Sequence, residues 1–377
     1  MKVLEVMASG ERGGGAYHLL TLLPALRALG VECEACVSEN GPLADRLVEL
    51  GFVVHRLPLM GSRFDPRSPV RLVNLLREVR PDLVHWHGTR AAFFGAFALR
   101  LARGRQHPED VPRAVYTVHG LSYRKTISAG GTTAGRALFR RVERMACAGA
   151  ARVISVSAAD LEDLTRRRFI APGQGRHVPN ALNLSRFVPG DRAAARARIG
   201  IPETDFLVGT VSRLVPQKTV GDLVDALARV PHATLVVIGD GPERSAVEHR
   251  IRRLGLCERV RLLGARDDVP ALLAAFDIFA LSSRWEGEPI ALLEAMAVGV
   301  PCVATAVGGT CEVLAGGEAG VLVPVGDPAA LAAAIELLRL DPEHRARLEC
   351  AGRARMRSRT PERLAQAVLD VYEDAAN

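Results

Sequence analysis

Two carboxylates on either side of a helix start carry the strongest chemical signal in this sequence. Glu286 precedes the predicted helix PIALLEAMAVG, and Glu294 lies inside it. Pro289 suits the first helical position, where its missing N–H costs nothing. The free backbone amides of Ile290 and Ala291 then point out of the helix N-terminus, where an anion such as phosphate binds favourably. The sequence therefore predicts one anion site flanked by two acids.

A simpler interpretation of the two acids stays open. Glu286 can cap the helix, and Glu294 can form an ion pair at the surface. Glu294 stands amid the apolar run IALLEAMAV, however, where a charge without a partner is expensive. This position favours a functional role for Glu294.

Two loops that follow predicted strands add groups that suit an anion. Arg213 and Lys218 lie in TVSRLVPQK, although they can also be ordinary loop charges. Gly13, Gly14 and Gly15 follow the first predicted strand and open a helix, so that the backbone can approach a phosphate closely. Their spacing is not the G-x-G-x-x-G of a dinucleotide site.

Three histidines close two further predicted strands. His119 ends RAVYTVHG, while His85 and His87 share one face of PDLVHWHG. Three imidazoles can bind zinc, but the sequence shows no oriented second shell, and packing or acceptor-side roles are favoured for His85 and His87. The chain also has no D-x-D segment that would anchor a divalent ion. We therefore expect a metal-independent mechanism with no metal and no cofactor, in which Arg213, Lys218 and the helix amides supply the positive charge.

Predicted strands and helices alternate along the whole chain. Strand-like runs such as KVLEVMA and VECEACVS are separated by helical runs such as YHLLTLLPALRALG. This alternation favours parallel sheets with helices on both faces, and ligands of such sheets bind beyond the carboxyl ends of the strands. The pattern breaks in the Pro, Gly and Asn punctuation of residues 179–202 and then restarts.

The length supports the same division, because 377 residues exceed what one hydrophobic core usually serves. We predict an α/β protein of two Rossmann-like, doubly wound domains in tandem. The N-terminal domain spans residues 1–187 and the C-terminal domain residues 188–360. The amphipathic helix in residues 361–377 is expected to pack back on the N-terminal domain.

Composition and charge narrow the class of protein and of partner. No apolar run reaches the ~18–20 residues of a membrane span, and seven scattered cysteines suit reduced thiols, so we expect a cytoplasmic protein. Residues 1–187 hold 27 Lys and Arg against 16 Asp and Glu, which gives them a net charge of +11. A basic half suits an anionic substrate or membrane surface. Nucleic acid is not expected, because no basic stripe is interleaved with aromatic residues.

The segment SRWEGEPIALLEAMAVGVPCVATAVGGTCEVL resembles the E-x7-E segment and the following glycine loop of retaining glycosyltransferases of family 4. Further segments agree with that family in order and spacing: GERGGGAYHLL, PDLVHWHG, TVHG, VISVSAAD, VPNALNLSRF, GTVSRLVPQK and VVIGDGPE. The resemblance implies the GT-B architecture, in which two Rossmann-like domains face a cleft. It departs from the family pattern at Glu288, where an apolar residue is common, and at Asn183, where Asp is usual.

The resemblance also implies roles for the C-terminal site residues. Glu294 would hold the ribose hydroxyls of a nucleotide, and Glu286 a hydroxyl of the donor sugar. Arg213 and Lys218 would stabilise the departing diphosphate electrostatically. The remaining donor-binding residues of this segment are Gly287, Ile290 and Ala291.

Two N-terminal elements receive roles in the same way. The loop with Gly14 and Gly15 would face the donor diphosphate across the interdomain cleft, and His119 would reach the donor sugar from the opposite wall. We therefore expect a retaining glycosyltransferase that moves a hexose-type sugar from a UDP- or GDP-sugar to a glycan, lipid-linked or small-molecule acceptor. Alternatives are a nucleotide-sugar 2-epimerase or hydrolase of the same architecture, or a sugar-nucleotide-binding protein without turnover.

A basic helix is predicted in TTAGRALFRRVERMACAGA. Its arginines, Arg136, Arg140, Arg141 and Arg144, recur at helical spacing beside Leu138, Phe139, Val142 and Met145. Such a helix is either a solvated surface element or a contact for an anionic acceptor or membrane leaflet. Peripheral association with the inner face of an anionic membrane is therefore a hypothesis of the sequence.

Overall fold

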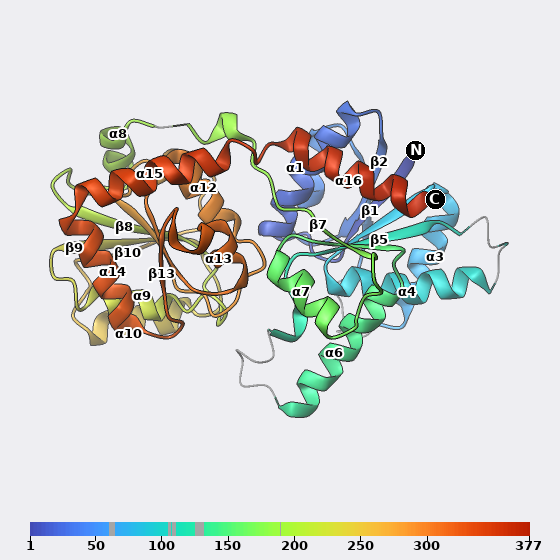
Figure 1. Cartoon of the computed structure of the whole chain (residues 1–377), viewed down its shortest axis with the longest axis horizontal. Helices are drawn as coiled ribbons and strands as arrows, with labels where there is room; N and C mark the ends of the chain where they lie inside the picture. The colour runs from blue at the N-terminus through green and yellow to red at the C-terminus, as the bar shows by residue number, and fades with distance from the viewer. Residues whose placement is uncertain (60–64, 105–106, 108–110, 125–131, 189) are drawn as a thin grey trace. The chain divides into compact units, whose positions relative to one another are not determined.

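The computed structural model describes residues 1–377 apart from residues 60–64, 105–106, 108–110, 125–131 and 189. The chain forms two compact units (Figure 1). Unit 1 comprises Met1–Ala181 and Pro361–Asn377, and unit 2 comprises Leu182–Thr360. The chain therefore passes between the units twice, first within the Pro and Asn punctuation noted in the sequence.

Unit 1 is built on a parallel sheet in the order β3-β2-β1-β4-β5-β6-β7. Its strands are β1 (Lys2–Met7), β2 (Glu32–Ser38), β3 (Val53–Leu57), β4 (Leu83–His87), β5 (Arg113–Val118), β6 (Arg152–Ser155) and β7 (Gly175–His177). Its helices are α1 (Gly14–Ala28), α2 (Leu43–Glu49), α3 (Arg67–Val79), α4 (Thr89–Arg103), α6 (Thr133–Ala148), α7 (Ala158–Arg166) and α16 (Pro361–Ala376).

Helices cover both faces of this sheet, as the alternating pattern predicts. One apolar core holds side chains of α3, α4 and α6, and the other holds those of α1, α2 and α16. Helix α16 packs on α1 and on strands β5 and β6 through an apolar face that includes Leu364, Val368 and Tyr372. The last helix of the chain thus belongs to the core of unit 1.

Unit 2 repeats the design with a parallel sheet in the order β10-β9-β8-β11-β12-β13. Its strands are β8 (Phe206–Val211), β9 (Ala233–Ile238), β10 (Val260–Gly264), β11 (Ile278–Leu281), β12 (Cys302–Thr305) and β13 (Val321–Val323). Its α-helices are α8 (Arg192–Arg198), α9 (Val220–Leu227), α10 (Arg244–Arg253), α11 (Val269–Leu273), α12 (Ile290–Val298), α13 (Gly308–Val313), α14 (Pro328–Leu340) and α15 (Pro342–Met356), and short 3-10 turns span Leu184–Arg186 and Ala315–Gly317. The prediction of two doubly wound sheets in tandem is therefore confirmed.

Each sheet has one point at which the strand order reverses. In unit 1 it lies between β1 and β4, and in unit 2 between β8 and β11. The loops leaving neighbouring strands there run to opposite faces, which opens a crevice beyond the carboxyl ends of the strands. Any ligand site of either unit is expected at these two points.

Candidate functional site

The reversal point of unit 2 brings a cation and an acid of the predicted site together. Lys218 lies in the loop after β8, and Glu286 lies in the loop after the neighbouring strand β11. The Nζ atom of Lys218 is 2.5 Å from Oε1 of Glu286. The two groups predicted from separate segments thus form one ion pair where the fold places ligands.

Two neutral side chains hold the Glu286 carboxylate from the same loops. Ser283 Oγ donates to Oε1 at 2.5 Å, and Gln217 Nε2 donates to Oε2 at 3.3 Å. Glu286 is 5% exposed, so this carboxylate is fixed in a largely dry position. Helix α12 begins without a side-chain cap, and the simpler interpretation of Glu286 as a helix cap is wrong.

Helix α12 starts at Ile290, and Pro289 is its N-cap in an extended conformation. The expected first helical position of Pro289 is therefore wrong by one residue. Ile290 and Ala291 still supply the first-turn amides, for which the helix itself offers no carbonyl partner. A Cβ on Gly309 would lie 1.4 Å from the carbonyl oxygen of Gly287, so only glycine lets the two loops approach this closely.

Glu294 differs from Glu286 in having no hydrogen bond or ion pair among the residues that the structure describes. It is half-buried on α12, and burial raises the pKa of its carboxyl to about 8. Arg186, at the end of the 3-10 turn Leu184–Arg186, opposes this shift through its positive charge. The alternative of a surface ion pair for Glu294 is therefore wrong, and its carboxyl has unused bonding capacity.

Arg213 lies in the same loop as Lys218, but the structure does not join the two. Its side chain is exposed, and within the described ranges its guanidinium has neither a hydrogen bond nor an ion pair. An exposed arginine at the end of β8 is available to an anionic ligand. The two cations thus differ, because Lys218 is already engaged by Glu286.

The reversal point of unit 1 gathers histidines from three elements. His87 ends β4, His119 follows β5, and His18 projects from α1, whose N-cap is Gly13. His87 Nδ1 lies 3.2 Å from His119 Nε2, and the rings of His18 and His119 meet edge to face at 4.9 Å between centroids. A Cβ on Gly15 would lie 3.7 Å from Cδ2 of His119, so the glycine loop and His119 are neighbours.

Among the described residues, no candidate metal group joins His85, His87 and His119, for which the sequence did not favour zinc. His85 instead bonds to Thr117 Oγ1 through Nε2 and to Tyr372 OH through Nδ1, each at 2.7 Å. Two other groups have potential ligand atoms within 4.8 Å of one another: His18 with His87 and His119, and Glu5 with His85 and His87. Most of their nitrogen atoms face hydrogen-bonding partners at normal distances, but the buried Nε2 of His18 has none among the described residues.

The sequence reasoning missed Glu5, His18, Asn180 and Tyr372. Glu5 is fully buried in β1 and accepts from His87 Nε2 and Tyr372 OH, each at 2.7 Å. His18 Nδ1 lies 2.9 Å from Asn180 Oδ1. The sequence signal that could have marked Glu5 as a site residue is a charge inside the otherwise apolar strand KVLEVM. For His18 the signal is its spacing after the glycines in GGGAYH.

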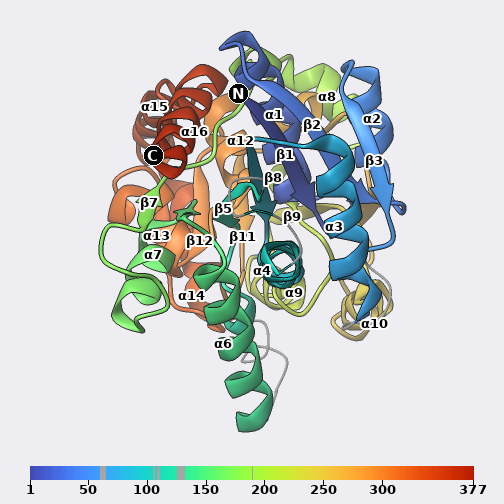
Figure 2. The same ribbon diagram turned by 90° about the vertical axis from the view of Figure 1, so that its right-hand side faces the viewer.

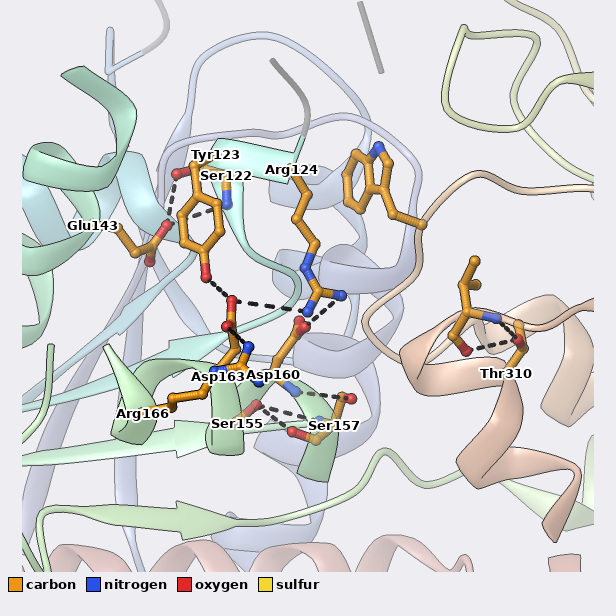
Figure 3. A network of polar contacts seen from close by, with 12 residues as sticks. Ser122, Tyr123, Arg124, Glu143, Ser155, Ser157, Asp160, Asp163, Arg166 and Thr310 are labelled. Atoms are coloured by element: carbon orange, nitrogen blue, oxygen red, sulfur yellow. Dashed lines mark hydrogen bonds and ion pairs between the residues drawn. The ribbon is translucent and has the colours of Figure 1, made fainter. Parts of the chain in front are cut away.

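A polar network anchors residues 122–124, which follow His119 closely in the chain (Figure 3). Ser122 Oγ donates to the buried Glu143 carboxylate at 2.6 Å, and Tyr123 donates to Asp163. Arg124 Nη1 pairs with Asp160 at 3.1 Å. These contacts hold residues 122–124 against helices α6 and α7, and burial raises the pKa of Asp160 to about 6.

Glu288, one of the two departures from the family pattern, forms a buried ion pair. Its Oε1 lies 2.8 Å from Nη1 of Arg359, and the two side chains are 1% and 12% exposed. The backbone oxygen of Arg359 also accepts from Leu182 N at 2.9 Å. The segment between Glu286 and α12 is thus tied to both places where the chain leaves unit 2. At Asn183, the other departure, the side chain accepts from Ser185 Oγ at 2.7 Å.

Helix α6 extends from the unit 1 sheet (Figures 1 and 2) and presents a mixed outer face. Arg140, Arg141 and Arg144 are exposed on it, together with Leu138 at 48% and Met145 at 42% exposure. Phe139 packs inward against the apolar core, and Val142 is half-buried. The outer face is therefore both basic and apolar. None of the described helices is long and apolar enough to cross a membrane.

Two sequence families match almost the whole chain. The family described as Glycosyltransferase Family 4 matches residues 12–186, and that described as Glycosyl transferases group 1 matches residues 191–355. The chain is 34% identical to the D-inositol 3-phosphate glycosyltransferase of Salinispora tropica, over 97% of this chain and 82% of that protein.

A second relative and a solved structure add to this likeness. The UDP-Gal:alpha-D-GlcNAc-diphosphoundecaprenol alpha-1,3-galactosyltransferase of Escherichia coli is 29% identical over 77% of this chain and 75% of that protein. The crystal structure of Anabaena Alr3699/HepE in complex with UDP and glucose matches with a TM-score of 0.85 at 25% identity, over 99% of this chain and 100% of that chain.

Proposed function

The chain belongs to glycosyltransferase family 4 and is a glycosyltransferase of GT-B fold, and we propose that it transfers a sugar from a nucleoside diphosphate with retention of anomeric configuration and without a metal ion. The observation that carries the proposal is the Lys218–Glu286 pair at the reversal point of unit 2, beside the start of α12. Nearby Glu294 has unused bonding capacity.

The proposed donor site lies in unit 2, where separate groups of the protein bind the diphosphate, the ribose and the sugar of the donor. The first-turn amides of Ile290 and Ala291 receive the diphosphate, together with Arg213 and Lys218. Glu294 accepts hydrogen bonds from the ribose hydroxyls, and Glu286 from a hydroxyl of the sugar. The glycine loop with Gly14 and Gly15 and the nearby His119 form the proposed donor contacts from unit 1.

In the proposed reaction the bond between the sugar carbon and the diphosphate oxygen breaks as negative charge grows on the diphosphate. Lys218, Arg213 and the helix amides stabilise that charge, which a divalent cation does in other enzymes. The departing phosphate oxygen takes the proton of the acceptor hydroxyl on the face from which it leaves. The acceptor oxygen then bonds to the same face, which retains the configuration without a protein nucleophile.

The proposed donor base is uracil or guanine. The likeness to a protein solved with UDP and glucose supports a UDP-sugar. The same comparison supports a hexose-type sugar.

The proposed acceptor is a glycan or a lipid-linked sugar, and a small polyol phosphate is a further acceptor of the same polar class. One relative acts on a diphosphoundecaprenol-linked sugar, which supports an acceptor at a membrane. The basic and apolar outer face of α6 suits the anionic surface that carries such an acceptor. We therefore place the enzyme in the cytoplasm, with peripheral attachment to the inner face of the membrane.

A product assay tests the proposal. Thermal shifts first identify the donor among UDP- and GDP-sugars, since a ligand at 100 times its Kd adds about 2.7 kcal/mol of apparent stability. The protein is then incubated with that donor, with and without a lipid-linked sugar acceptor, in EDTA. We expect a glycoside whose anomeric coupling constant by NMR equals that of the donor. An inverted anomer, an epimerised or hydrolysed sugar as the main product, or loss of activity in EDTA would contradict the proposal.

A further inference from the structure

A buried carboxylate stands behind the histidine cluster of unit 1. Glu5 is 0% exposed in the middle of β1, where its register partner on β4 is His85. Burying a carboxylate costs free energy unless hydrogen bonds replace its water. Three groups do so here: Tyr372 OH donates to Oε1 at 2.7 Å, His87 Nε2 donates to Oε2 at 2.7 Å, and His85 Nδ1 lies 3.1 Å from Oε2.

Glu5 is ionised in this setting. Burial alone would raise the pKa of its carboxyl, but the charge of His85 and the hydrogen bonds from His85 and His87 outweigh burial and hold the pKa well below its usual range. An ionised carboxylate only accepts hydrogen bonds. The facing atom, Nε2 of His87, must therefore carry a hydrogen.

The position of the hydrogen on the His87 ring determines which nitrogen of the His119 ring carries a hydrogen. Burial lowers the pKa of His87 to about 4, so its ring is neutral and carries only one N–H. Nδ1 of His87 is then a lone pair, and His119 Nε2 faces it at 3.2 Å. His119 fills this contact as a donor through Nε2–H, and its own Nδ1 is left as the acceptor nitrogen.

We infer that Glu5 and Tyr372 are positioning residues for His119: through His87 they fix the His119 tautomer, so that Nδ1 accepts a hydrogen bond from a sugar hydroxyl. This inference rests on the proposed function, in which His119 contacts the sugar. Tyr372 lies on helix α16 and donates a hydrogen bond to Glu5. Helix α16 therefore has a second role besides packing in unit 1. Neither residue touches the proposed sugar itself.

The arrangement follows a general pattern of functional imidazoles. When one ring nitrogen contacts a ligand, the other forms a hydrogen bond with a carboxylate or with a group that a carboxylate orients. Loss of such an orienting partner costs about 10- to 100-fold in activity. Here the orientation passes through one additional ring, so we expect a loss of about 10-fold in kcat for the sugar transfer.

Nitrogen-15 NMR of the imidazole rings tests the inference directly, because the two neutral tautomers have distinct shifts. We expect the Nε2–H tautomer for His119 in the wild-type protein. In Glu5→Gln the side-chain amide can both donate and accept, so His87 and His119 should become mixtures of tautomers. In the same variant kcat should fall about 10-fold, while the affinity for UDP, which is bound by unit 2, stays unchanged.

A matched control separates this role from general stability. Glu34 accepts from His55 Nε2 at 2.7 Å on the neighbouring strand β2, outside the cluster, so Glu34→Gln removes the same kind of pair. It should leave the His119 tautomer and kcat unchanged. If Glu5→Gln does not fold, Tyr372→Phe removes one hydrogen bond from Glu5 and should shift the His87 resonances and lower kcat less than tenfold.

Three results would overturn the inference. The first is an Nδ1–H tautomer of His119 in the wild-type protein. The second is an unchanged His119 tautomer and kcat in a folded Glu5→Gln or Tyr372→Phe variant. The third is a stoichiometric zinc ion in the purified protein that is lost on His119→Ala. Because the tautomer is read without substrate, failure of the proposed transfer reaction would not alter this readout.

Discussion

Lys218 and Glu286 are 68 residues apart in the sequence, yet their Nζ and Oε1 atoms lie 2.5 Å apart in unit 2. They lie in the loops that follow the neighbouring strands β8 and β11. Ser283 and Gln217 donate hydrogen bonds that hold the carboxylate in place. Both side chains are largely buried, at 18% and 7% exposure. The ammonium and the carboxylate are therefore held close together in a largely dry position.

Lys218→Ala should lower kcat more than donor affinity. The ammonium stabilises charge that grows as the donor bond breaks, and loss of one such group costs on the order of 10²-fold in rate. Steady-state kinetics with varied donor measures both constants. Lys2→Ala is the control, since Lys2 pairs with Glu34 in unit 1, away from the site, and should keep full activity. A rise in KM with unchanged kcat would contradict the role of Lys218 in the transition state.

Glu294→Gln should stabilise the protein at high pH. Burial raises the pKa of Glu294 from 4.5 to about 8, so the folded state holds a proton that the unfolded state releases. The stability linked to this proton is full below pH 4.5 and is lost as the pH rises through about 8. Glu294→Gln has no titrating carboxyl at this position and does not lose this stability. At pH 9 its free energy of unfolding should exceed that of the wild-type protein by about 1 to 3 kcal/mol.

Thermal unfolding at pH 4 and pH 9 measures this effect. The wild-type protein and Glu294→Gln should unfold at similar temperatures at pH 4, where the Glu294 carboxyl is mostly protonated in both the folded and the unfolded state. The variant should be more stable at pH 9. A stability difference that does not change with pH would show that the Glu294 carboxyl does not titrate as the structure indicates.

Gly309→Ala should disable the donor loop. Its Cβ would lie 1.4 Å from the carbonyl oxygen of Gly287, so the backbone between Glu286 and α12 has to move. We expect a loss of more than about 10-fold in kcat/KM, because small displacements of positioned groups are costly. Gly352→Ala on α15 is the control, since its Cβ would be 3.6 Å from Met296 Cβ, an ordinary contact. Activity of Gly309→Ala equal to that of the control would be inconsistent with this packing.

Arg140→Ser/Arg141→Ser should weaken binding to anionic vesicles. Each basic residue near such a surface contributes roughly 1 kcal/mol at low salt, and the attraction fades within a Debye length. Co-sedimentation at low and high salt, with anionic and neutral vesicles, measures the effect. Arg252→Ser/Arg253→Ser removes two adjacent exposed arginines from α10 of unit 2 and should have no effect. Equal binding of the wild-type protein to anionic and neutral vesicles would leave α6 as a solvated helix.

Much of the fold could be predicted because buried parallel strands form apolar runs of distinctive length. The runs KVLEVMA, VECEACVS and RAVYTVHG all proved to contain strands. The edge strands β7 and β13 were missed, since Gly175–His177 and Val321–Val323 are three residues long and carry too little pattern. Edge strands bury only part of their surface, which weakens the apolar signal.

Candidate site residues could be predicted where they lie in one short segment, as Glu286 and Glu294 do in the E-x7-E run. They could not be predicted where partners come from distant elements. Nothing in the spacing of the chain joins Glu5 to Tyr372, and the separation of 367 residues is closed only by the packing of α16. The contacts of His85 were not predictable for the same reason, because its ring bonds to Tyr372 and Thr117. Pairing between helices and strands determines such contacts, and it is not a property of local sequence.

We propose that Glu286 and Glu294 act on different parts of one donor. Glu294 has no partner in the described part of the chain and lies inside α12, whereas Glu286 is paired with Lys218 before the helix. In this proposal Glu294 binds the nucleotide and Glu286 binds the sugar.

Isothermal titration of UDP into the wild-type protein, Glu294→Gln and Glu286→Gln, alongside kcat for transfer, tests that claim most directly. Glu294→Gln should weaken UDP binding by about 10-fold, as expected for one lost hydrogen bond. Glu286→Gln should bind UDP as the wild-type protein does and lose turnover. Full UDP affinity and full activity in both variants, or equal loss of UDP affinity in both, would contradict the division of roles.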